Sequence, residues 1–140
     1  MENRETLHLL VVDDNFDEVE IFEEFLRFLL DSLGITVVVT LIDNYREALA
    51  AIQNRTIHPQ TTAVLFDGQL GHSDHGYTDG ETLITQFNAI PEYAHIHRIG
   101  ISNTSGKPSG ADAYYTKNEL VNPDKIKSFY KFIQQPRQTR

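Results

Sequence analysis

Five polar side chains follow short apolar runs of the sequence, at the points where strands are expected to end. Asp13 and Asp14 follow LLVV, Asp67 follows AVLF, Ser102 follows IGI, and Lys117 follows AYYT. In an open α/β sheet, ligands bind outside the carboxyl ends of the strands, so these groups should meet at one edge. Each of them alone is more often a cap or a loop residue, but their occurrence together and in this order indicates a site.

The expected site has the chemistry of phosphoryl transfer. Carboxylates crowded together from two strands need a compensating cation, and hard oxygen ligands completed by water suit Mg²⁺. Asp67 stands on the strand between the other contributors, so it is the best-placed nucleophile toward a phosphoryl group, with which a carboxylate forms an acyl phosphate. Mg²⁺ and Lys117 would neutralise the charge that develops on the transferring oxygens, and Ser102 could donate a hydrogen bond to one of them.

The elements that position these residues alternate between buried strands and amphipathic helices. Near-continuous apolar runs are typical of the strands of a parallel sheet, which are buried on both faces. These runs cover 7–12, 35–42, 62–66, 99–101 and 113–116. The order predicts one α/β domain, a doubly wound sheet of five parallel strands in the flavodoxin-like order 2-1-3-4-5.

The helices between these strands are indicated by apolar residues at three- and four-residue spacing and by three start signals. The signals are Asn44 followed by Glu47, Thr78 followed by Glu81, and Asn122 followed by Pro123. The apolar pattern of the first helix runs from Val19 to Leu33, and Phe16, Phe22, Phe25 and Phe28 with Leu29 and Leu30 cover more than one of its faces. We expect this helix to be well buried on the sheet. The alternative is that Phe28 or Leu30 belongs to a docking or dimer surface, with the neighbouring acids setting the choice of partner.

The charge and composition exclude several classes of protein. The chain has 140 residues, no cysteine and a formal net charge of −8, and residues 1–32 hold ten acids and two bases. An acidic surface repels phosphate backbones, so we expect no direct contact with nucleic acid. The absence of cysteine excludes disulfides and thiol catalysis. No stretch approaches the ~20 apolar residues of a membrane helix, and we expect a soluble, cytoplasmic protein without membrane attachment.

Taken together, five segments resemble the receiver domain of two-component response regulators, the family of CheY-like proteins. They are LHLLVVDDN, VLFDGQL, DGETLI, GISN and GADAYYTK. The resemblance covers residues 6–134, with short tails at 1–5 and 135–140. It implies that a histidine kinase or a histidine phosphotransfer protein phosphorylates Asp67, and that the domain then signals to a downstream protein. It also implies a signalling phosphoacceptor, which catalyses only its own phosphorylation and dephosphorylation and is not an enzyme with a separate substrate.

The resemblance assigns further roles at the site. Mg²⁺ would be bound directly by Asp14, through water by Asp13, and by Asp67 and the backbone carbonyl of Gln69. Lys117 would pair with the phosphoryl group. Ser102 would turn inward on phosphorylation and Tyr114 would move with it, which is a two-state switch biased by one local charge.

The sequence departs from the family pattern in several places. The usual proline soon after the phosphoacceptor is missing, and Asn118 replaces the proline that commonly follows the lysine. The segment 68–79 is longer than usual and holds His72 and His75, for which an exposed loop is a better interpretation than a second metal site. The segment between Ser102 and Lys117 is shorter than usual and contains glycine and proline, so the family's fourth helix should be shortened or absent across 103–112. Dimerisation through that surface is therefore doubtful, and we expect a monomer or a weak dimer.

These observations favour a stand-alone response regulator receiver, because the chain ends soon after its last helix. The alternative that the chain is a fragment of a longer protein stays open. The alternative is a degenerate receiver that binds partners without phosphorylation, which the missing prolines favour and the complete set of site residues opposes. A phosphatase of the haloacid dehalogenase type would need an Asp where Gln69 stands. A flavodoxin is disfavoured, because its phosphate would meet Asp13, Asp14 and Asp17.

Overall fold

Five strands alternate with helices in the computed structural model, which describes residues 5–68, 70, 79–102 and 110–137. The strands are β1 (Glu5–Val12), β2 (Ile35–Ile42), β3 (Thr61–Asp67), β4 (His97–Ser102) and β5 (Ala113–Thr116). The α-helices of the described residues are α1 (Phe16–Asp31), α2 (Tyr45–Asn54), α3 (Asp79–Asn88) and α4 (Pro123–Gln134), and short 3-10 helices occupy Pro91–Tyr93 and Glu119–Val121.

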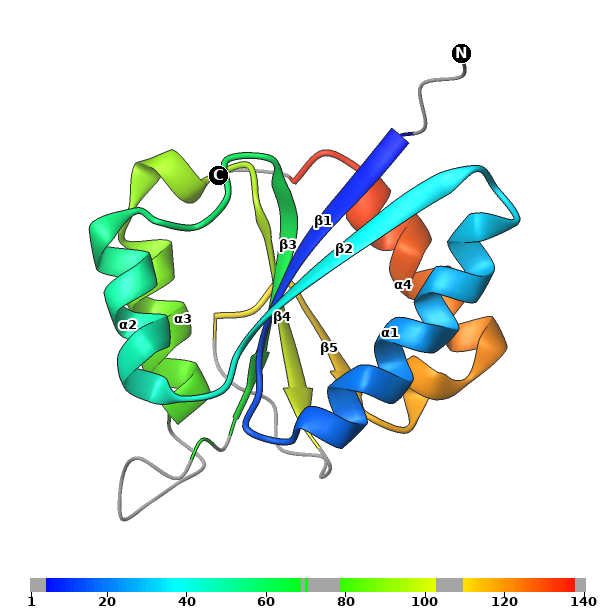
Figure 1. Ribbon diagram of the computed structural model, residues 1–140. Helices are drawn as coiled ribbons and strands as arrows, with labels where there is room; N and C mark the ends of the chain where they lie inside the picture. The colour runs from blue at the N-terminus through cyan, green and yellow to red at the C-terminus, as the bar shows by residue number, and fades with distance from the viewer. Residues whose placement is uncertain (1–4, 69, 71–78, 103–109, 138–140) are drawn as a thin grey trace.

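The strands form one parallel sheet in the order β2-β1-β3-β4-β5. Helices α1 and α4 cover one face of this sheet, and α2 and α3 cover the other (Figure 1). All carboxyl ends therefore lie at one edge, which is the lower edge in Figure 1. The predicted fold class and strand order are confirmed.

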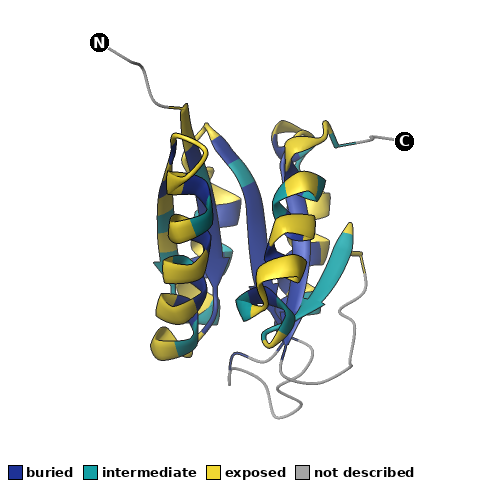
Figure 2. Ribbon diagram, turned by 90° about the vertical axis from the view of Figure 1, so that its right-hand side faces the viewer, coloured by how far each residue is buried: buried dark blue, intermediate teal, exposed yellow. Residues whose placement is uncertain are grey.

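The central strands β1, β3 and β4 are buried on both faces over most of their length, as predicted, whereas the edge strands β2 and β5 are only partly buried. Along β1, Leu9 and Val11 belong to the core beneath α1 and α4, whereas Leu10 and Val12 belong to the core beneath α2 and α3. Figure 2 shows the buried strands between two layers of helices whose outer surfaces are exposed. Full burial of a Leu or Val side chain contributes about 1.5–3 kcal/mol, so these two cores stabilise the sheet whose strand ends carry the site residues.

Asparagine caps fix where three of the helices begin. Asn44 accepts a hydrogen bond from the backbone N–H of Glu47, at 2.9 Å, as predicted for α2. Asn122 caps α4 through the N–H groups of Asp124 and Lys125. Helix α1 begins earlier than its apolar pattern indicates, because Asn15 accepts from the N–H of Glu18 at 3.1 Å. Such caps satisfy backbone donors that the first helical turn leaves unpaired.

Residues 110–112, which lead into β5, form a turn and a bend held against β4 and α3. The Asp112 N–H donates to the backbone carbonyl of Arg98, and the Asp112 carboxylate accepts from the Arg98 N–H and, at 2.9 Å, from Arg137 Nε. The Arg98 guanidinium is buried and donates to the Asn88 side chain and to two backbone carbonyls. Asn88 donates in turn to the carbonyl of Gly110. This network fixes the entry to the last strand.

Three expectations fall wholly or partly outside the described residues. They are the helix start at Thr78, the form of the loop across 68–79, and the shortened helix across 103–112, of which 103–109 are not described. In the part of the chain that the structure covers, no helix is long and apolar enough to cross a membrane.

Candidate functional site

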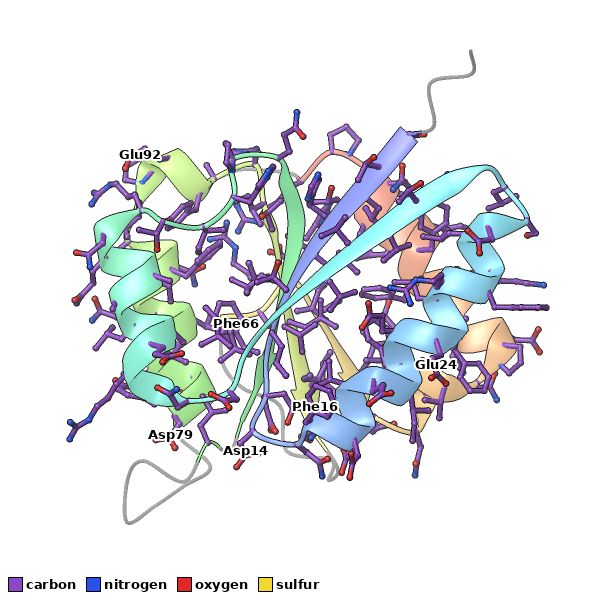
Figure 3. All side chains as sticks on the ribbon, viewed as in Figure 1. Asp14, Phe16, Glu24, Phe66, Asp79 and Glu92 are labelled. Carbon is purple, nitrogen blue, oxygen red and sulfur yellow. The ribbon has the colours of Figure 1, made fainter. Side chains whose placement is uncertain are left out.

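Three carboxylates meet at the carboxyl ends of β1 and β3. Val12 is paired with Phe66 across these neighbouring strands, so Asp13 and Asp67 follow side by side. Oxygen atoms of Asp13, Asp14 and Asp67 all lie within 4.8 Å of one another. Asp13 and Asp67 are buried, whereas Asp14 is exposed at the edge where the strands end (Figure 3). The structure thus brings together the three carboxylates that the strand ends indicated.

Lys117 reaches these carboxylates from the end of β5. Its backbone N–H donates to the carbonyl of Ser102 at 2.9 Å, which seats the residue beside β4. Its Nζ lies 2.8 Å from Asp13 Oδ2 and 3.1 Å from Asp67 Oδ2. Burial alone would lower the pKa of Lys117, but the hydrogen bond and charge of Asp13, together with Asp67 and Glu18, outweigh it and raise the pKa. The ammonium therefore remains charged at neutral pH. Lys117 reaches the carboxylates even though Asn118 stands where the family pattern has a proline.

Ser102 and Tyr114 lie next to each other on β4 and β5. Ser102 is the last residue of β4 and is buried, and Tyr114 pairs with Gly100 in the strand register. The Ser102 hydroxyl is hydrogen-bonded to the Tyr114 hydroxyl, and either oxygen can donate. The two residues assigned to the switch are thus in direct contact, and their movement remains a prediction.

The first turn of α3 supports the end of β3. A Cβ atom on Gly80 would lie 2.2 Å from the backbone oxygen of Asp67, so only glycine allows this approach. The N–H of Gly80 donates to the carbonyl of Gly68, and the buried Asp79 carboxylate accepts from the N–H of Leu70 at 3.2 Å. Asp79 accordingly lies at the same end of the sheet as Asp14 (Figure 3).

Gly68 and Leu70 are thereby each tied to the first turn of α3. Gln69 itself is outside the described part of the chain, as are His72 and His75. The backbone-carbonyl ligand expected from Gln69 therefore remains a prediction, and the loop histidines are untested.

Glu18 is a site residue that the strand-end argument missed. It belongs to the first turn of α1, and its Oε2 lies 3.0 Å from Lys117 Nζ. The available sequence signal was the spacing of Asn15 and Glu18, which is typical of a helix start. That spacing indicates a cap but says nothing of a lysine 99 positions further along the chain.

The donor set fits a hard divalent cation. Among the described residues, the cluster of Asp13, Asp14 and Asp67 carries three carboxylates, and the ammonium of Lys117, which contacts Asp13 and Asp67, is also paired with Glu18, so negative charge is in excess. Mg²⁺ prefers oxygen ligands from one or two carboxylates and completes its shell with water. The exposed position of Asp14 leaves one side of the cluster open to solvent, where such water ligands can enter.

The fold and the site define a class: doubly wound α/β domains with an acidic cluster at the carboxyl ends of the strands. No protein-family model matches the chain, and no curated protein matches its sequence. Solved structures of response regulators do match it, over nearly its whole length.

The phosphorylated cyanobacterial phytochrome response regulator RcpA is 16% identical, with a TM-score of 0.68, and the match covers 93% of this chain and 95% of RcpA. The bacteriophytochrome response regulator AtBRR is 20% identical, with a TM-score of 0.61 and coverage of 93% and 91%. A response regulator receiver domain from Rhodospirillum rubrum is 14% identical, with a TM-score of 0.67 and coverage of 96% and 100%. The chain thus has the fold of response regulator receiver domains.

Proposed function

We propose that this protein is a response regulator receiver that accepts a phosphoryl group on Asp67 and passes the signal to a protein partner. One observation carries the proposal: Asp13, Asp14 and Asp67 converge with Lys117 at the ligand-binding edge of a receiver fold. A similar structure, that of RcpA, is of a phosphorylated response regulator. Such a domain is a signalling phosphoacceptor, and it turns over no separate substrate.

In the proposed reaction, an oxygen of Asp67 attacks the phosphorus of a phosphohistidine on a kinase or a phosphotransfer protein. The new P–O bond forms as the P–N bond breaks, and the imidazole nitrogen keeps that electron pair and takes a proton from water. Asp14 and Asp67 would hold Mg²⁺ directly and Asp13 through water, and the ion would stabilise charge on the phosphoryl oxygens. Lys117 already contacts Asp67 and is placed to pair with the same oxygens.

The proposed switch follows from the contact between Ser102 and Tyr114. An acceptor oxygen on phosphorylated Asp67 would compete with the Tyr114 hydroxyl for the hydrogen bond of Ser102. Release of Tyr114 would change the surface around β4 and β5, which is the site that we propose signals to the partner.

The outer surface of α1 supports a role in docking the phosphodonor. Ile21, Phe25 and Phe28 recur at helical spacing and are 47%, 40% and 83% exposed. The expected burial of this helix is correct for Phe22 and Leu30, but Phe28 is exposed, and Leu30 takes no part in a surface. Acids line the same helix, and Glu24 extends from its outer side (Figure 3). An apolar stripe bordered by acids fits a partner with an apolar patch and basic edges better than it fits a second copy of this acidic helix.

Incubation with acetyl phosphate, with and without Mg²⁺, tests the proposal by intact mass. We expect one phosphoryl group on the wild type, dependent on Mg²⁺, and none on Asp67→Asn. The alternative of a degenerate receiver predicts neither an adduct nor Mg²⁺ binding by calorimetry.

A further inference from the structure

Glu18 differs from the other two carboxylates that contact Lys117. Within the described residues, the cluster suited to a metal contains Asp13, Asp14 and Asp67, and Glu18 is not part of it. Lys117 Nζ nevertheless lies as close to Glu18 Oε2, at 3.0 Å, as to Asp67 Oδ2, at 3.1 Å. Glu18 is therefore a counter-ion of the lysine that stands outside the cluster.

The position of Glu18 is fixed by its own helix. Its other carboxylate oxygen accepts from Asn15 Nδ2 at 2.8 Å, while its N–H donates to Asn15 Oδ1. The side chain is 30% exposed, so the pair with Lys117 is partly shielded from water. The first turn of α1 thus presents one carboxylate oxygen to the cap and the other to the lysine.

A divalent cation at the cluster would change the contacts of Lys117. It would draw the oxygens of Asp13 and Asp67 toward itself, and it would repel the ammonium as a like charge. Both effects weaken the hold of Asp13 and Asp67 on Lys117, whereas Glu18 remains available as an anion.

We propose that Glu18 is a positioning residue, which keeps the Lys117 ammonium beside Asp67 when a divalent cation occupies the acidic cluster. The inference rests on the proposed function, since it assigns the lysine a task during phosphorylation. Glu18 touches neither the phosphoryl group nor the cation, and it acts through Lys117.

The test compares two variants that remove one negative charge from the same helical turn. Glu18→Gln keeps the backbone N–H and a side-chain carbonyl oxygen for the two hydrogen bonds to Asn15, because Gln can replace Glu in such a cap. The substitution removes the ion pair with Lys117. Asp17→Asn removes the neighbouring, exposed charge and is the matched control. Phosphorylation by acetyl phosphate is followed across a range of Mg²⁺ concentrations.

For Glu18→Gln we expect the maximal rate to fall about tenfold, as is typical when a supporting partner is lost. The Mg²⁺ concentration at half-maximal rate should stay close to that of Asp17→Asn, because both variants lose the same charge. Equal maximal rates for the two variants would overturn the inference. So would a loss that saturating Mg²⁺ restores, since that result assigns Glu18 to cation attraction.

A second measurement does not depend on phosphorylation. Ammonium protons held in an ion pair exchange slowly enough to be observed by NMR of ¹⁵N-lysine-labelled protein. With Mg²⁺ bound, we expect the Lys117 signal, assigned by its loss in Lys117→Arg, in the wild type and Asp17→Asn but not in Glu18→Gln. Persistence of the signal in Glu18→Gln would refute the positioning role, whereas a wild type that binds Mg²⁺ but accepts no phosphoryl group would refute the proposed function alone.

Discussion

Replacement of Gly80 by alanine tests whether α3 positions the end of β3 at Asp67. In a free helix, this change stabilises by about 0.5–1 kcal/mol, because alanine has less conformational freedom to lose. Here the added Cβ would stand 2.2 Å from the Asp67 oxygen and 2.9 Å from Gly68 Cα, where Cβ atoms in proteins keep at least 3.0 Å. The helix or the strand end must therefore move by about 0.8 Å. Overpacking of this kind costs about 1–3 kcal/mol.

We accordingly expect Gly80→Ala to lower the free energy of unfolding by about 1–2 kcal/mol in urea titrations. Because the shift displaces Asp67, the Mg²⁺ affinity measured by calorimetry should fall about tenfold. Gly34→Ala is the control: its φ of +75° makes alanine unfavourable, yet nothing lies within 4 Å of the added atom. That variant should lose about 1 kcal/mol of stability and keep its Mg²⁺ affinity. A more stable Gly80→Ala protein with unchanged Mg²⁺ affinity would refute the reasoning.

Three further predictions concern other parts of the molecule. Phe28→Ser should leave stability within about 0.5 kcal/mol and labelling by acetyl phosphate unchanged, but slow transfer from the phosphodonor protein; equal transfer rates would exclude docking at α1. Burial, together with the charge of Arg137, lowers the pKa of Arg98 to about 10, against the opposing effect of Asp112. Arg98→Leu should cost about 3 kcal/mol in urea titration, because it leaves the Asn88 side-chain oxygen and the backbone carbonyls of Tyr93 and Ile96 without their donor. Burial and the charge of His58, whose ring stacks on that of His8, lower the pKa of His8, so the unfolded chain binds this proton first and stability should fall as the pH drops below 6.5. His58→Gln should reduce that slope in urea titrations at several pH values, and an unchanged slope would contradict the assignment.

The strand order and the acidic cluster follow from local patterns that the sequence displays. Apolar runs long enough for buried strands stand directly before Asp13, Asp67 and Lys117. Because parallel strands all end at one edge, the residue that follows each run could be placed at that edge before any contact was known.

The start of β4 shows where such patterns fail. The strand begins at His97, ahead of the apolar run that starts at Ile99, and both His97 and Arg98 are buried. Their polar atoms bind partners from distant segments, among them the backbone oxygen of Gln135, at 2.6 Å from His97 Nε2. A periodicity argument assigns polar residues to the surface, because it has no access to such partners.

The site residues that the sequence missed have the same explanation. Glu18 belongs to the site through its ion pair with Lys117, Asp79 through the hydrogen bond that it accepts from Leu70, and Gly80 through its close approach to the backbone of Asp67. Each of these contacts joins segments that are brought together only by the folded sheet. The sequence did not predict the exposure of Phe28 for a related reason, since apolar residues cover more than one face of α1 and their pattern does not say which face is outermost.

The central claim is that Asp67 forms an acyl phosphate, and chemical identification of that bond tests it most directly. Borohydride reduces an aspartyl phosphate to homoserine, so protein treated with acetyl phosphate and Mg²⁺ is reduced, digested and mapped by peptide mass spectrometry. We predict homoserine at position 67 alone, and none when Mg²⁺ is removed by a chelator. Homoserine at Asp13 or Asp14, or a phosphoryl adduct that survives borohydride, would contradict the account.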